Sequence, residues 1–131
     1  MFLDSEIDLY NSLFNLKKKY KIKGIKAEFE AEGSSNENIS KLRALTNKVN
    51  VELHTKIGGV EAINDIYFSI ECGVDGIIAP MVETDFAVVK FIESIKKLKL
   101  KKKPFLSINI ESKTGLKNID DILKRSNNFI D

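Results

Sequence analysis

The sequence predicts an α/β fold with a parallel sheet, and three observations support this prediction. Short segments that alternate between apolar and polar residues are followed by longer segments with helical periodicity, four times in succession. Residues typical of helix starts and stops, such as Ser, Thr and Gly, stand between the segments. Strands that are joined through helices pair in parallel, with right-handed crossovers.

An amphipathic helix opens the chain over residues 5–20, within an N-terminal segment 1–22, and four strand–helix units follow. Ser34 and Glu37 have the spacing of a capping box, Gly73 is expected to end a helix, and Thr84 to cap the next one. The predicted strands are 23–33, 50–59, 74–83 and 103–112, and the helices after them are 34–49, 60–72, 85–100 and 115–125.

Three of the strands place charged or polar side chains on the face opposite their apolar residues. A doubly wound sheet has helices on both faces, so its strands should be almost continuously apolar. One polar face instead favours the wall of a (β/α)8 barrel, which holds its active site at the carboxyl ends of the strands. The alternative is a solvated polar strand face. The polar positions are Lys26, Glu28, Glu30 and Glu32; Glu52, His54 and Lys56; and Ser107, Asn109 and Glu111.

The chain is about half as long as such a barrel requires. A complete barrel takes about 250 residues, and this chain has 131. We expect residues 1–131 to form a single domain, the first half of a (β/α)8 barrel, with residues 127–131 starting a fifth strand. The chain is then a truncated piece that is inactive alone. The alternative is a half barrel that pairs with itself and so covers its open sheet edges.

Composition narrows the classes of function. The net charge of +2 argues against a nucleic-acid partner, and the lysine-rich segment 96–103 is expected to be a solvated helix end. No apolar segment reaches the ~18 residues of a membrane span. The single Cys72 excludes an internal disulfide, and the opening residues lack a signal-peptide pattern. We therefore expect a soluble, cytoplasmic protein.

Two segments together resemble the HpcH/HpaI aldolase and citrate lyase β-subunit family. They read GVDGIIAPMVETDFAVVKFIESI and INIESKTGLKNIDDIL, and KIGGVEA is similar to one branch of that family. The resemblance covers about residues 24–131. It implies a (β/α)8 barrel and a divalent-metal-assisted cleavage or formation of a carbon–carbon bond next to a carbonyl. For the full-length form we also expect a homo-oligomer.

The resemblance also implies roles for individual residues. Glu111 would be one of two carboxylate ligands of Mg²⁺ or Mn²⁺, and Asn109 would contact the substrate where many relatives have Gln. Lys56 lies where aldolase members place an Arg that steadies the developing enolate, so it is a catalytic and substrate-binding candidate. The second metal ligand of the family is an Asp in a Gly-x-x-Asp-Leu motif beyond this chain, and Asp131 is not that residue.

The first strand departs from the family pattern. Family aldolases have Asp-x-Glu-His there, whereas this chain has Glu28 and Glu30 and no His. We take both glutamates as catalytic candidates, and His54 as a proton-transfer candidate or a structural residue. The predicted function is a metal-dependent lyase that acts on a 2-oxo acid or an acyl thioester. The alternative is a non-catalytic barrel that binds an acidic metabolite or a protein partner.

Overall fold

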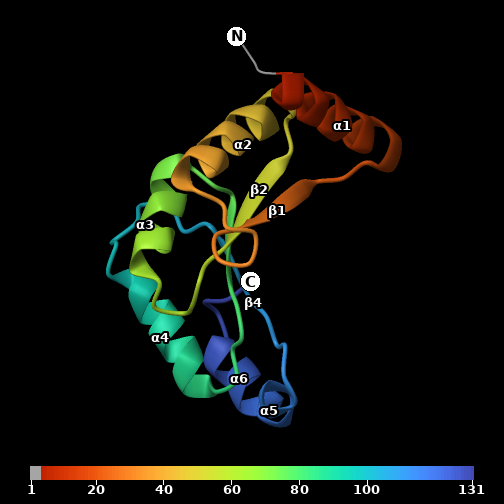
Figure 1. Ribbon diagram of the computed structural model, residues 1–131. Coiled ribbons are helices and arrows are strands. Elements are labelled where there is room, and N and C mark those ends of the chain that lie inside the picture. The colour runs from red at the N-terminus through yellow and green to blue at the C-terminus, as the bar shows by residue number, and fades with distance from the viewer. Residues whose placement is uncertain (1–3) are drawn as a thin grey trace.

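The computed structural model describes residues 4–131, which form a four-stranded parallel sheet with most of the helices along one side (Figure 1). The strand order β1-β2-β3-β4 follows the chain, so every connection crosses over through a helix. The predicted α/β fold is confirmed, while residues 1–3 of the predicted N-terminal segment lie outside the described residues. The elements are α1 Asp4–Tyr20, β1 Gly24–Glu28, α2 Asn36–Val49, β2 Glu52–Lys56, α3 Ile63–Cys72, β3 Gly76–Ala79, α4 Asp85–Lys96, β4 Phe105–Ile108, α5 Lys113–Lys117 and α6 Ile119–Ser126.

The core lies between the sheet and the helices. Each strand contributes one buried residue to a row that crosses the sheet, in which neighbouring strands pair these residues in register. The side chains of this row face the helices. Each of the helices α2, α3, α4 and α6 adds a fully or almost fully buried apolar side chain to the same cluster. The strand residues are Ala27, Thr55, Ile77 and Leu106, and the helix residues include Ile39, Ile66, Phe91 and Ile122.

One polar pair is buried in this otherwise apolar core. The hydroxyl groups of Thr55 on β2 and Ser69 on α3 lie 2.8 Å apart, and neither residue is exposed to solvent. A buried hydroxyl needs a hydrogen-bond partner, so the pair fixes α3 against β2.

The first strand is shorter than predicted. It ends at Glu28, because the chain turns back and the Glu32 carboxylate accepts a hydrogen bond from the Glu28 N–H at 3.1 Å. Gly33 completes the turn with a positive φ of 61°. The placement of Glu30 and Glu32 on a strand was therefore wrong.

The N-cap of α2 lies one residue later than predicted, and the helix begins at Asn36 rather than at residue 34. Ser35 is the N-cap, and its hydroxyl accepts from the Asn38 N–H at 3.2 Å while the Asn38 side chain accepts from the Ser35 N–H at 3.0 Å. The capping box thus uses Ser35 and Asn38, and the assignment of Ser34 and Glu37 was wrong. The predicted cap at Thr84 is confirmed.

The predicted helix 115–125 is two helices, α5 and α6, which meet at Asn118. The Asn118 N–H still bonds to carbonyls of α5, whereas its side chain donates to the Glu83 carbonyl at 2.8 Å. This bond to the β3–α4 loop turns the chain and separates the helices.

The C-terminal residues lie beside the outer edge of β4. The Asp131 N–H donates to the Leu106 carbonyl at 2.9 Å, and the Asp131 carboxylate accepts from the Leu106 N–H at 2.9 Å and from Lys103 at 2.7 Å. The C-terminal residues thus lie where a fifth strand would pair with β4, although residues 4–131 do not form a fifth strand. Across residues 4–131, no helix has the length and apolar character that a membrane span requires.

Candidate active site at the carboxyl end of the sheet

The sheet face that carries no helices holds the polar residues in two levels. At the level nearer the carboxyl end, Glu28 on β1 is in register with Lys56 on β2, followed by Ile78 and Ser107. One level toward the amino end come Lys26, His54, Gly76 and Phe105. The register therefore brings Glu28 and Lys56 together at the end of the sheet where barrel enzymes hold their sites.

Glu28 is the centre of an ion-pair network. Its side chain bonds to Lys26, two residues earlier on the same strand, and to Lys56 Nζ at 3.1 Å across the strand pair. Glu28 is only 7% exposed. The hydrogen bond from Lys26, and then that from Lys56, hold the pKa of the Glu28 carboxyl below its usual value.

We expect the Glu28 carboxyl to titrate below the usual pKa of a glutamate in an NMR titration of side-chain carboxyl carbons. Since its pKa is lowered in the folded state, the network stabilises the fold above the pKa of the unfolded chain. That stabilisation is lost as the pH falls through the lowered pKa. Lys26→Met and Lys56→Met should each raise the Glu28 pKa, Lys26→Met more strongly.

Lys41→Met is the matched control for this titration, because Lys41 bonds to Glu37 at 2.8 Å on α2. It should raise the pKa of Glu37, which that pair holds below its usual value, and leave the Glu28 pKa unchanged. An unchanged Glu28 pKa in both Lys26→Met and Lys56→Met would contradict the network.

Glu111 lies beyond the end of β4 rather than on the strand. The Asn109 N–H still bonds to the Ala79 carbonyl of β3 at 2.9 Å, and the Asn109 side chain donates to Glu111 Oε1 at 2.8 Å. The pKa of Lys26 is raised, first by its hydrogen bond to Glu28 and also by the charges of Glu28, Glu32 and Glu111. Glu111 and Asn109 therefore belong to the same electrostatic environment as the Glu28 network.

Residues that the sequence analysis did not single out hold the loop that carries Glu111. Ser112 caps α5 and donates to the Glu83 carboxylate at 2.5 Å, and Asn118 donates to the Glu83 carbonyl. A Cβ atom at Gly115 would lie 2.9 Å from the Val82 carbonyl oxygen, so α5 is in close contact with the loop after β3. Ser112 is a residue type preferred at N-caps, which was the signal for the cap, whereas its bond to Glu83 depends on the fold.

The structure does not bring His54 or Glu30 into this network. His54 lies at the lower level, where its Nε2 is 3.0 Å from Glu52, and its ring packs over Gly76 with its centroid 5.5 Å from that of Phe105. Glu30 is exposed after the end of β1 and lies next to Gly58 in the loop after β2. The catalytic roles of both residues stay predictions.

The described residues offer part of a metal-binding set. Among residues 4–131, no three histidine, cysteine, aspartate or glutamate side chains lie together so that they could hold a metal ion. Glu111 supplies a carboxylate and Asn109 an amide oxygen, and such oxygen donors suit Mg²⁺ and Mn²⁺. Mg²⁺ sites often have one or two carboxylates and complete the coordination with water and substrate.

A comparison with solved structures identifies the architecture. The chain is similar to the crystal structure of an HpcH/HpaI aldolase/citrate lyase family protein from Burkholderia cenocepacia J2315, with a TM-score of 0.68 and 11% sequence identity. The chain therefore has an α/β fold that matches part of a TIM-barrel-like fold. The similarity covers 86% of this chain and 55% of that protein, so the chain spans about half the length of its neighbour. No family model and no curated protein matches the sequence.

Proposed function

We propose that this chain forms part of a carbon–carbon lyase of the aldolase and citrate lyase type, acting on a small carboxylate such as a 2-oxo acid or an acyl thioester. The observation that carries the proposal is the Glu28–Lys56 pair at the carboxyl end of the sheet, with Glu111 in the same electrostatic environment. The structural neighbour has the same arrangement of strands and is described as an aldolase/citrate lyase family protein.

Lys56 is the group that we propose acts on the substrate. Its ammonium is held by Glu28 at 3.1 Å, so it is fixed before a substrate arrives. A fixed positive charge stabilises negative charge that develops on a substrate oxygen, and it does so best where water is excluded. An ammonium contacts one oxygen at a time, whereas a guanidinium contacts two, so Lys56 would give weaker orientation than the Arg of family aldolases.

Glu111 is the group that we propose binds Mg²⁺ or Mn²⁺, with Asn109 orienting its carboxylate through their 2.8 Å hydrogen bond. A divalent ion at this position would withdraw electron density from the substrate carbonyl. Because no three carboxylate, histidine or cysteine side chains lie together within residues 4–131, we expect the isolated chain to bind the ion weakly.

The test is a calorimetric titration of the 131-residue chain with Mn²⁺. We expect Glu111→Gln to weaken Mn²⁺ binding by about 10-fold or more. Substitution of residues that only support a metal ligand already reduces metal affinity by about this factor. The matched control is Glu93→Gln, which removes an exposed carboxylate on α4 and should leave the affinity unchanged. Unaltered affinity in Glu111→Gln would contradict the proposed metal role.

One observation favours a second candidate, a non-catalytic barrel that binds an acidic metabolite. His54, the single histidine of the chain, is paired with Glu52 at the lower level of the sheet. Pyruvate release from oxaloacetate or an aldol adduct, abolished in Lys56→Met, would support the lyase. Binding of the 2-oxo acid without turnover would support the second candidate.

A further inference from the structure

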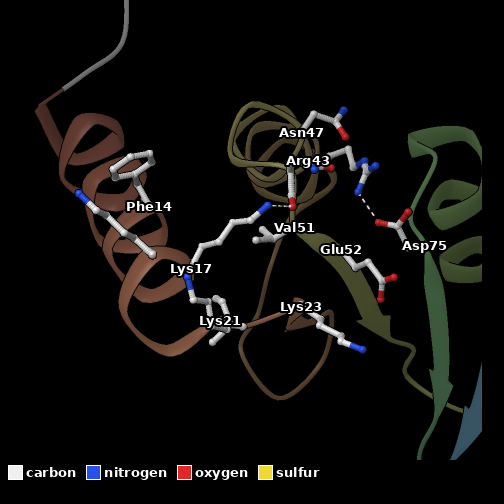
Figure 2. A pocket seen from close by; sticks show the side chains of 12 residues that line it. Phe14, Lys17, Lys21, Lys23, Arg43, Asn47, Val51, Glu52 and Asp75 are labelled. Atoms are coloured by element: carbon white, nitrogen blue, oxygen red, sulfur yellow. Dashed lines mark hydrogen bonds and ion pairs between the residues drawn. The ribbon is translucent and has the colours of Figure 1, made fainter.

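A cavity of about 670 Å³ lies at the amino end of β1 and β2, opposite the candidate active site (Figure 2). It is enclosed by α1, α2 and the segments that lead into the two strands. Its volume is within the range of about 300–1,000 Å³ that is typical of small-molecule sites. The candidate active site does not use this region.

The lining of the cavity has an excess of positive charge. Five cationic side chains and two carboxylates line it, and the cations are Lys17, Lys18, Lys21, Lys23 and Arg43. An excess of three positive charges in a partly enclosed space raises the local concentration of anions.

Part of this charge already has partners within the fold. Arg43 donates to Asp75 at 2.6 Å, and Lys17 extends from α1 to the Asn50 carbonyl just after α2 (Figure 2). Lys17 Nζ also lies 3.0 Å from the Val49 carbonyl at the end of α2. The side-chain ammonium groups of Lys18, Lys21 and Lys23 form no hydrogen bond or ion pair within residues 4–131, although the backbones of Lys21 and Lys23 do. Three ammonium groups are thus available to a ligand.

The remaining lining consists of three apolar side chains and two asparagines, Asn47 and Asn50. Phe14 on α1 is 47% exposed, and Val51 and Ile22 line the cavity beside it. An exposed aromatic ring next to unpaired ammonium groups suits a ligand that combines an anionic group with an apolar group. Lysine binds phosphate as a point charge, and two negative charges match the unpaired lysines better than one.

We propose that this cavity binds a phosphate monoester with an aromatic or apolar organic group. The unpaired ammonium groups of the lining hold the phosphate, and Phe14 contacts the organic group. The site lies at the opposite end of the sheet from Glu111 and Lys56, so it operates independently of the proposed lyase site.

The test is calorimetric titration of the chain with phenyl phosphate at an ionic strength of about 0.1 M, where the Debye length is about 10 Å. We expect saturable binding that weakens about tenfold in Lys21→Ala/Lys23→Ala, which corresponds to the loss of a charge-assisted contact. The matched control is Lys101→Ala/Lys102→Ala, which removes the same charge from an exposed segment that does not line the cavity. This control should change the affinity by no more than about twofold, because salt screens distant charges.

Two further probes separate the parts of the ligand. Benzoate keeps the ring with one negative charge, and inorganic phosphate keeps the charge without the ring, so both should bind more weakly than phenyl phosphate. Phe14→Ala should weaken the binding of phenyl phosphate and not that of inorganic phosphate. Equal losses in the two double-lysine variants, absence of saturable binding, or inorganic phosphate binding as tightly as phenyl phosphate would each overturn the proposal.

Discussion

Phe91→Ala is expected to lower the free energy of unfolding by about 3–5 kcal/mol, the usual cost of removing a buried aromatic side chain. Phe91 is 0% exposed and lies on α4, where it belongs to the cluster that joins the helices to the sheet. Its removal leaves a cavity that the strands and helices around it can fill only in part. Urea denaturation followed by circular dichroism measures the loss.

Phe86→Ala is the control on the same helix. Phe86 is 64% exposed, and its ring lies 5.3 Å from Lys90 Nζ. Its removal should change the free energy of unfolding by no more than about 0.5 kcal/mol, as is usual for surface substitutions. Equal losses for Phe86→Ala and Phe91→Ala would contradict the assignment of the core to the inner side of α4.

Thr55→Val is expected to lower the free energy of unfolding by about 1–3 kcal/mol, although the two side chains have nearly the same shape. The change removes the hydroxyl group that lies 2.8 Å from Ser69 Oγ and leaves the Ser69 hydroxyl buried without this partner. The same denaturation experiment measures the effect.

The double variant Thr55→Val/Ser69→Ala tests the cause. It removes both hydroxyl groups, so no polar group is left without its partner, and it should recover part of the stability that Thr55→Val loses. A double variant that loses the full sum of the two single losses would show that the hydroxyl groups do not act as a pair.

The order of elements was predictable from the sequence because it depends on local patterns. The alternation of apolar and polar residues predicted that Lys26, Glu28, His54 and Lys56 share the face without helices, and the register confirms this. The cap at Thr84 and the stop at Gly73 also depend on residues close in sequence.

The remaining features depend on contacts between distant segments. The end of α5 at Asn118 follows from a bond to Glu83, which is 35 residues away in the chain. The pairing of Glu28 with Lys56 requires the exact register of β1 and β2, which alternation alone leaves open. His54 lies one level nearer the amino end of the sheet than Lys56, with which β2 ends. The sequence pattern predicted a longer strand, 50–59, so it did not show this position.

The two outer strands share one feature with a consequence for self-association. At each edge of the sheet, a carboxylate accepts a hydrogen bond from a backbone N–H that points away from the neighbouring strand. Glu32 accepts from the Glu28 N–H on β1, and Asp131 accepts from the Leu106 N–H on β4. Unpaired edge groups are templates on which strands of other molecules add and aggregates grow. Here an incoming strand must first displace a bound carboxylate and then accommodate a negative charge beside its own carbonyl groups. Lys103 also holds the pKa of Asp131 below its usual value, so the β4 edge keeps this protection in mildly acidic solution.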